Sequence, residues 1–123
     1  MPVVISSKTE YTGTSTPSAL NTETTVIEIT AQSDTYIVEG WLDLGNLASG
    51  DTVVIKVYVA VDGTNYRTYS TATYSYPVTD PIIRFHSTQL CKNMKYKVTI
   101  TQTAGSSVKS FPYGFILEVL GTL

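Results

Sequence analysis

The sequence has little of the chemistry that enzymes and metal sites use. It contains one cysteine, Cys91, and one histidine, His86, among 123 residues. A single cysteine excludes an intrachain disulfide, and we expect Cys91 to be a packed or idle thiol, with an interchain bridge or a nucleophile as the alternative. His86 precedes Cys91 by five positions, and no third orienting group accompanies them. A Cys-His catalytic site is therefore only weakly indicated.

The acidic residues and glycines form no recognisable site either. Asp34, Asp43, Asp51, Asp62 and Asp80 mostly fall in predicted turns, where an aspartate carboxylate caps the backbone. The sequence has no calcium-loop run, CxxC, HExxH, phosphate-binding glycine loop or dinucleotide fingerprint. We therefore predict a protein that is not an enzyme and that has no cofactor and no metal.

Charge and hydropathy exclude further classes of partner. Eight Lys and Arg stand against ten Asp and Glu, a net charge of −2, whereas binding to nucleic acid phosphates needs a basic excess. No apolar run is long enough to span a membrane. The first ten residues, MPVVISSKTE, lack a basic leader followed by an apolar stretch, so we expect no signal peptide. Neither nucleic acid nor a membrane is a predicted partner.

What the sequence does contain is β-strand patterning. Apolar and polar residues alternate in stretches separated by turn signals, and no segment keeps a helical period. The predicted strands cover residues 24–30, 35–44, 52–61, 66–74, 81–90, 95–103 and 111–120. In 52–61, every second residue from Val53 to Val61 is Val or Ile, which predicts one inward face.

These strands predict an all-β fold, an antiparallel two-layer β-sandwich of seven or eight strands. We predict jelly-roll topology, with an immunoglobulin-like Greek key as the second choice. The predicted core is Val53, Ile55, Val57, Tyr96, Val98, Ile100, Phe115, Leu117 and Val119.

Residues 1–23 have a different composition from the rest. They are rich in Ser and Thr and show little periodicity after Val3, Val4 and Ile5. We predict two parts, an extended N-terminal arm at 1–23 and the sandwich at 24–123. Because the three apolar residues are β-branched, we expect the arm to add a strand to a neighbouring subunit. A poorly ordered tail is the alternative.

Tyrosine is abundant and charge is absent around one predicted hairpin. The chain has nine tyrosines, and residues 68–79 carry no charge. Tyrosine suits protein interfaces, and an uncharged edge strand aggregates unless something covers it. We therefore predict a homo-oligomer. The predicted interface residues are Val3, Val4, Ile5, Tyr58, Tyr66, Arg67, Tyr69, Tyr74 and Tyr76.

Four segments carry a resemblance to known proteins: GWLDLGNLASGDTVVIKVYVAVDGTNYR, IIRFHSTQL, KYKVTITQTAG and KSFPYGFILEVL. Together they resemble small uncharacterised all-β virion structural proteins of bacterial and archaeal viruses, over roughly residues 20–123. The shared motifs are structural, so no functional residue is carried over. The resemblance implies a capsid, decoration, tail or fibre component that is made in the host cytoplasm and resides in the virion. Its implied partners are other copies of itself and another virion protein.

A binding module is the competing interpretation. Exposed tyrosines and Trp41 would also suit a carbohydrate- or receptor-binding β-sandwich, with a glycan as partner. Coplanar exposed aromatic rings near Asp or Asn would favour this alternative, whereas rings dispersed into interfaces would count against it.

Overall fold

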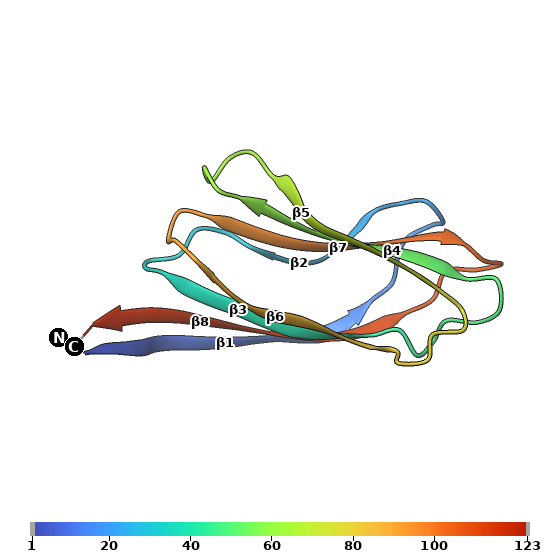
Figure 1. Cartoon of the computed structure of the whole chain (residues 1–123), viewed down its shortest axis with the longest axis horizontal. Helices are drawn as coiled ribbons and strands as arrows, with labels where there is room; N and C mark the ends of the chain where they lie inside the picture. Colours follow the sequence, from blue (N-terminus) through green and yellow to red (C-terminus); the bar gives the residue numbers. More distant parts are fainter. Residues whose placement is uncertain (1, 123) are drawn as a thin grey trace.

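The computed structural model describes residues 2–122 as eight antiparallel strands in two layers (Figure 1). The strands are β1 Val3–Ser15, β2 Thr24–Ile29, β3 Tyr36–Asp43, β4 Thr52–Ala60, β5 Arg67–Ser75, β6 Ile82–Leu90, β7 Lys95–Ala104 and β8 Phe111–Thr122. The seven predicted strands from residue 24 onward are confirmed to within two residues at either end. No helix, and so no helix that could cross a membrane, occurs among these described residues.

The strand order identifies the topology. One sheet has the order β1-β8-β3-β6 and the other β2-β7-β4-β5, so each sheet combines strands from both ends of the chain. We call the sheet that contains β8 the β8 sheet and the sheet that contains β7 the β7 sheet. Eight strands interleaved in this way form a jelly roll, which confirms the first choice of topology over the immunoglobulin-like one.

The core lies between the sheets because alternate residues of each strand point inward. All nine residues predicted for the core are buried. Tyr36, Val38 and Leu42 on β3 join them, while Trp41 between them faces outward. The inward position predicted for Val61 is wrong: β4 ends at Ala60, the chain turns there, and Val61 is 71% exposed.

The N-terminal segment has a different place from the one predicted. Val3–Ser15 forms β1, which pairs along its whole length with β8 of the same chain. Residues 3–15 therefore belong to the sandwich in a single chain, and residues 16–23 connect its two sheets. This strand was difficult to recognise in the sequence because most of its inward positions, such as Ser7, Thr9 and Gly13, are not apolar, although Tyr11 pairs with the buried Phe115. The predicted bounds at residues 1 and 123 lie outside the described residues.

The hairpin between β4 and β5 turns on Asp62 and Gly63. Asp62 Oδ1 accepts hydrogen bonds from the amides of Thr64 and Asn65 at 2.9 and 2.7 Å. Gly63 has φ +78°, and a Cβ there would lie 2.6 Å from the Asn93 carbonyl oxygen. The turn therefore needs both an acceptor at Asp62 and a glycine at position 63.

The Asp62 carboxylate makes the stability of this turn depend on pH. Hydrogen bonds from the amides of Asn65 and Thr64 lower the pKa of Asp62 from 3.8 to about 2. A pKa lowered in the folded state stabilises the fold above the unfolded pKa, and this contribution is lost as the pH falls from about 4 toward 2.

We expect Asp62→Ala to lower the urea midpoint at pH 7, and the difference from the wild type to shrink toward pH 2. Urea unfolding at pH 7, 4 and 2.5 measures it. A difference that stays constant over these three pH values would contradict the role given to the carboxylate.

Candidate interaction surfaces

The outer face of the β8 sheet carries an exposed aromatic residue at its centre. Trp41 on β3 is 47% exposed, and it pairs across the sheet with Gly114 on β8 and Arg84 on β6. The Arg84 guanidinium lies 4.8 Å from the centre of the indole ring and forms a 2.8 Å ion pair with Glu39. The indole is thereby held in place by a cation-π contact at the surface.

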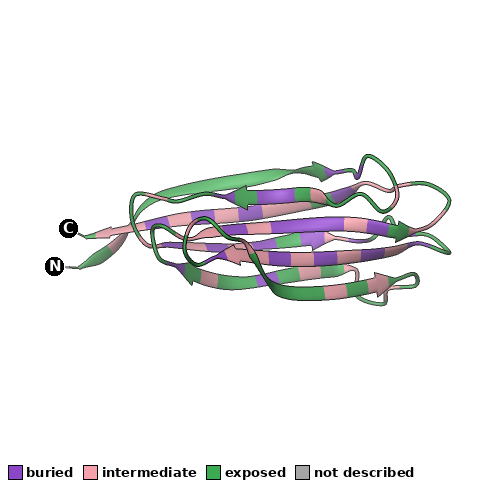
Figure 2. Cartoon of the chain, turned by 90° about the horizontal axis from the view of Figure 1, so that it is seen from above, coloured by how far each residue is buried: buried purple, intermediate pink, exposed green. Residues whose placement is uncertain are grey.

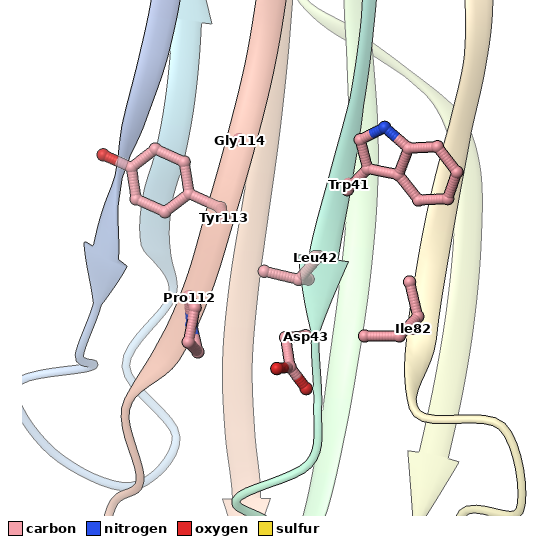
Figure 3. A pocket seen from close by; sticks show the side chains of 7 residues that line it. All are labelled: Trp41, Leu42, Asp43, Ile82, Pro112, Tyr113 and Gly114. Atoms are coloured by element: carbon pink, nitrogen blue, oxygen red, sulfur yellow. The ribbon is translucent and has the colours of Figure 1, made fainter.

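An open hollow of about 200 Å³ lies beside Trp41, between β8 and β6 (Figure 3). It exists because Gly114, opposite Trp41, has no side chain to fill the space: a Cβ there would meet only Thr12 Cγ2, at 3.8 Å. Ile82, 52% exposed, and Pro112 supply apolar walls. We call Trp41, Ile82, Arg84, Pro112 and Gly114 the Trp41 surface.

Further apolar side chains lie on the same outer face. Ile5 on β1 is 55% exposed and pairs with the half-buried Leu120 on β8. Ile37 and Ile116 are half-buried between residues whose side chains point into the core. A sheet face with large apolar groups, an Arg-Trp contact and few Lys residues has the composition of a protein interface.

The outer face of the β7 sheet is organised around Lys97. Its ammonium lies 5.1 Å from the ring centre of Tyr58 and 4.5 Å from that of Tyr66. The Tyr66 hydroxyl donates to Glu28 at 2.7 Å, and the Tyr58 hydroxyl donates to Glu23 at 2.5 Å. Two of the five predicted interface tyrosines, Tyr58 and Tyr66, are thus brought together, and their hydroxyls are already bonded within the chain.

Hydrogen bonds and burial shift the pKa values of three groups in this cluster. Hydrogen bonds from Thr99 and Tyr58 lower the pKa of Glu23. The hydrogen bond to Glu23, followed by burial, raises the pKa of Tyr58, while burial and the bond to Glu28 raise that of Tyr66. The cluster links the loop before β2 to strands β7 and β4, which is a bracing role.

The other predicted interface residues lie in different places. Tyr69, 67% exposed, lies at the rim of an open cleft of about 330 Å³ whose lining combines Phe85 and His86 of β6 with residues of β5. Tyr74 packs against the core, and Tyr76, 48% exposed, lines a hollow beside Leu44 and Leu47. Arg67 is exposed at the start of β5.

Val3, Val4 and Ile5 lie on β1 near the two chain termini (Figure 1). Val3 is 67% exposed and pairs with Thr122, while Val4 is half-buried. The predicted interface residues are therefore spread over separate parts of the molecule rather than gathered on one surface.

A buried polar cluster fixes the loops near one end of the sandwich. Asp51, 1% exposed, accepts a 2.8 Å hydrogen bond from the Ala48 amide and forms a 3.2 Å ion pair with Lys109. The side chain of Gln102, fully buried, accepts from the Lys109 amide at 2.8 Å. At Gly105, φ is +130° and a Cβ would lie 2.1 Å from Asp51 Oδ1. These contacts hold the β3–β4 and β7–β8 loops together, which makes the cluster structural.

The residues with catalytic or metal-binding chemistry do not form a site. His86 and Cys91 are both exposed, and neither side chain makes a hydrogen bond to another of the described residues. Within residues 2–122 no group of three His, Cys, Asp or Glu side chains is placed to hold a metal ion. The candidate functional regions described above are surfaces, and sequence reasoning missed the hollow beside Trp41.

Comparison with known proteins supports the fold but gives no family. No protein-family model and no curated protein matches the sequence. A chain from the structure of Bacillus endospore appendages, a family of disulfide-linked pili, matches with a TM-score of 0.54 and 15% identity. The match covers 95% of this chain and 88% of that one.

A chain from the acid-stable capsid of Helicobacter pylori bacteriophage KHP30 matches with a TM-score of 0.53 and 11% identity, over 99% of this chain and 98% of that one. A chain of infectious bursal disease virus matches at 0.49 and 13% identity, over 96% of this chain but only 32% of the viral one. At these identities the likeness shows the fold alone. The all-β fold of virion structural proteins, which the sequence resemblance implied, is confirmed at that level.

Proposed function

We propose that this protein is a non-enzymatic structural subunit that assembles with copies of itself into the shell or surface of a virion. The observation that carries the proposal is the Trp41 surface. It places an exposed tryptophan, an arginine stacked on it and an exposed isoleucine around a ready-made hollow. Trp and Arg are the residues most enriched among those that dominate binding energy at protein interfaces.

Two further features support self-assembly. Strand β5, an edge of the β7 sheet, is almost entirely exposed and has no charged residue after Arg67. Such an edge needs a cover to avoid aggregation, and an ordered neighbour provides one. The fold is also that of a bacteriophage capsid chain and a pilus chain of similar length. A virion, rather than a pilus, is proposed because the four sequence segments resemble virion structural proteins.

The test is the effect of the Trp41 surface on assembly. We expect Trp41→Ser to raise the protein concentration needed for assembly by roughly 30-fold, the effect of losing about 2 kcal/mol at an interface. Light scattering over a concentration series measures this.

Val61→Ser is the matched control, since Val61 is 71% exposed but lies on the β4–β5 hairpin, away from the Trp41 surface. The control should assemble like the wild type. If Trp41→Ser assembled at the same concentration as the wild type, the Trp41 surface would not be part of the interface.

The hollow also favours a second candidate function, the binding of a glycan. Trp41 could stack on a sugar ring, and Asp43, whose Oδ1 accepts from the Gly45 amide at 2.7 Å, lines the same hollow. The Trp41→Ser variant distinguishes the two proposed functions. Loss of glycan retention with an unchanged particle mass would favour the glycan site, whereas loss of assembly favours the structural subunit.

A further inference from the structure

Strand β1 is attached to the sandwich almost entirely through its backbone. Eleven of its thirteen residues are exposed and one is buried, as the green ribbon of this strand in Figure 2 shows. Its facing strand in the other sheet, β2, has only six residues and cannot cover it. Main-chain pairing with β8 is therefore what holds most of β1 in place.

The exposed part of β1 and its anchored part meet at Gly13. Ser15 and Pro17 are buried, and the Thr16 hydroxyl lies 2.7 Å from that of Ser110, so the chain is fixed from residue 15 onward. From Val3 to Thr12 no side chain is buried. Gly13 lies between the two parts, and a Cβ there would lie 3.0 Å from the Tyr113 hydroxyl, so this position has no side chain that anchors it. Residues 3–12 can thus separate from β8 while the sandwich keeps its core.

When residues 3–12 separate from β8, they leave an unpaired edge on β8, and one segment is the best match for this edge. The amides and carbonyls of β8 that now pair with β1 would be left open, next to half-buried side chains such as Leu120. The segment that matches this edge in length, register and side chains is residues 3–12 of another copy. Each hydrogen bond lost within one chain is regained between chains, so the exchange leaves the β8 edge paired.

We propose that residues 3–12 exchange between copies of this chain, each segment pairing with β8 of a neighbouring copy in the register seen within one chain. This inference rests on the proposed self-assembly and names the segment that links the subunits. A reciprocal exchange gives a dimer, and an exchange that does not close gives a longer chain of subunits.

The pair Lys8–Glu118 provides a position at which to detect the exchange. The Leu120 amide donates to the Thr35 carbonyl on the β3 side, and the Ser6 hydroxyl donates to the Val119 carbonyl on the β1 side. Successive residues of β8 point their backbone groups alternately toward β3 and toward β1. Glu118, two residues before Leu120, therefore points toward β3, so Lys8 and Glu118 form a non-hydrogen-bonded pair. The Cα atoms of such pairs are about 4.5 Å apart, which a disulfide can span.

The first experiment mixes two variants, both carrying Cys91→Ser to remove the native thiol. One variant has Lys8→Cys and the other has Glu118→Cys. After assembly and mild oxidation, we expect a disulfide between the two different chains, detected by mass spectrometry. Pairing Lys8→Cys with Thr103→Cys, an exposed position on β7, which lies between β2 and β4, is the control that should give no such product.

The second experiment places both cysteines in one chain and oxidises it as a monomer, which locks β1 onto its own β8. We expect the locked protein to stay monomeric and to assemble once a reductant is added. Assembly of the locked protein, or assemblies of the mixed variants without the crosslink, would overturn the exchange while leaving self-assembly intact. A parent protein that never assembles would overturn both proposals.

Discussion

Gly40→Ala is expected to destabilise the sandwich by about 3 kcal/mol, a large part of the 5–15 kcal/mol that holds a typical domain folded. Gly40 lies on β3 among inward-facing residues, and its Cα pairs with that of Phe115 on β8. A Cβ at Gly40 would lie 2.2 Å from Cδ2 of the Phe115 ring, which is 1% exposed. The ring would have to move, yet it packs 5.2 Å from the ring of Phe85. Urea unfolding at neutral pH measures the loss.

Gly114→Ala is the matched control for this prediction. Gly114 adjoins Phe115 on the same strand but faces outward, and a Cβ there would meet only an ordinary 3.8 Å contact. We expect a change in unfolding free energy within about 0.5 kcal/mol, as for a surface substitution. Equal effects of the two alanines would mean that Phe115 does not need the space left by Gly40.

Asp51→Ala should cost about 3 kcal/mol because it removes one member of a buried, charged cluster. The substitution leaves the Ala48 amide without its 2.8 Å acceptor and Lys109, whose side chain is 22% exposed, without its partner. Urea unfolding again measures the change.

The surface ion pair between Arg84 and Glu39 is the comparison, with side chains 43% and 26% exposed. Glu39→Gln should cost less than about 1 kcal/mol. A small effect at Asp51, similar to that at Glu39, would show that the two loops do not depend on the buried pair.

The sequence predicted the strands whose apolar residues alternate, because burial of one face leaves that pattern in the chain. In β4 the buried Val53, Ile55 and Val57 mark the core face, and the observed strand begins at the predicted residue. Strand β1 left no such pattern, since most of its inward-facing residues are polar or glycine and the opposite layer does not cover them. Composition therefore suggested an arm where the structure has an edge strand.

The Trp41 surface could not be predicted from the sequence, for a different reason. Trp41 adjoins the buried Leu42 in β3, so strand alternation alone places it on the outer face, where it lies. The hollow beside it, however, depends on Gly114, which is placed opposite Trp41 only by the register between β3 and β8. One sequence gives no information on the register of strands so distant in the chain.

The central claim, that this protein is a self-assembling structural subunit, is tested most directly by the mass of the wild-type protein. Light scattering from low to high concentration, with electron microscopy of the largest species, gives that mass. We predict a homo-oligomer many times heavier than the 13.4 kDa chain. A monodisperse monomer at high concentration, with no larger assembly in the native source, would contradict the account.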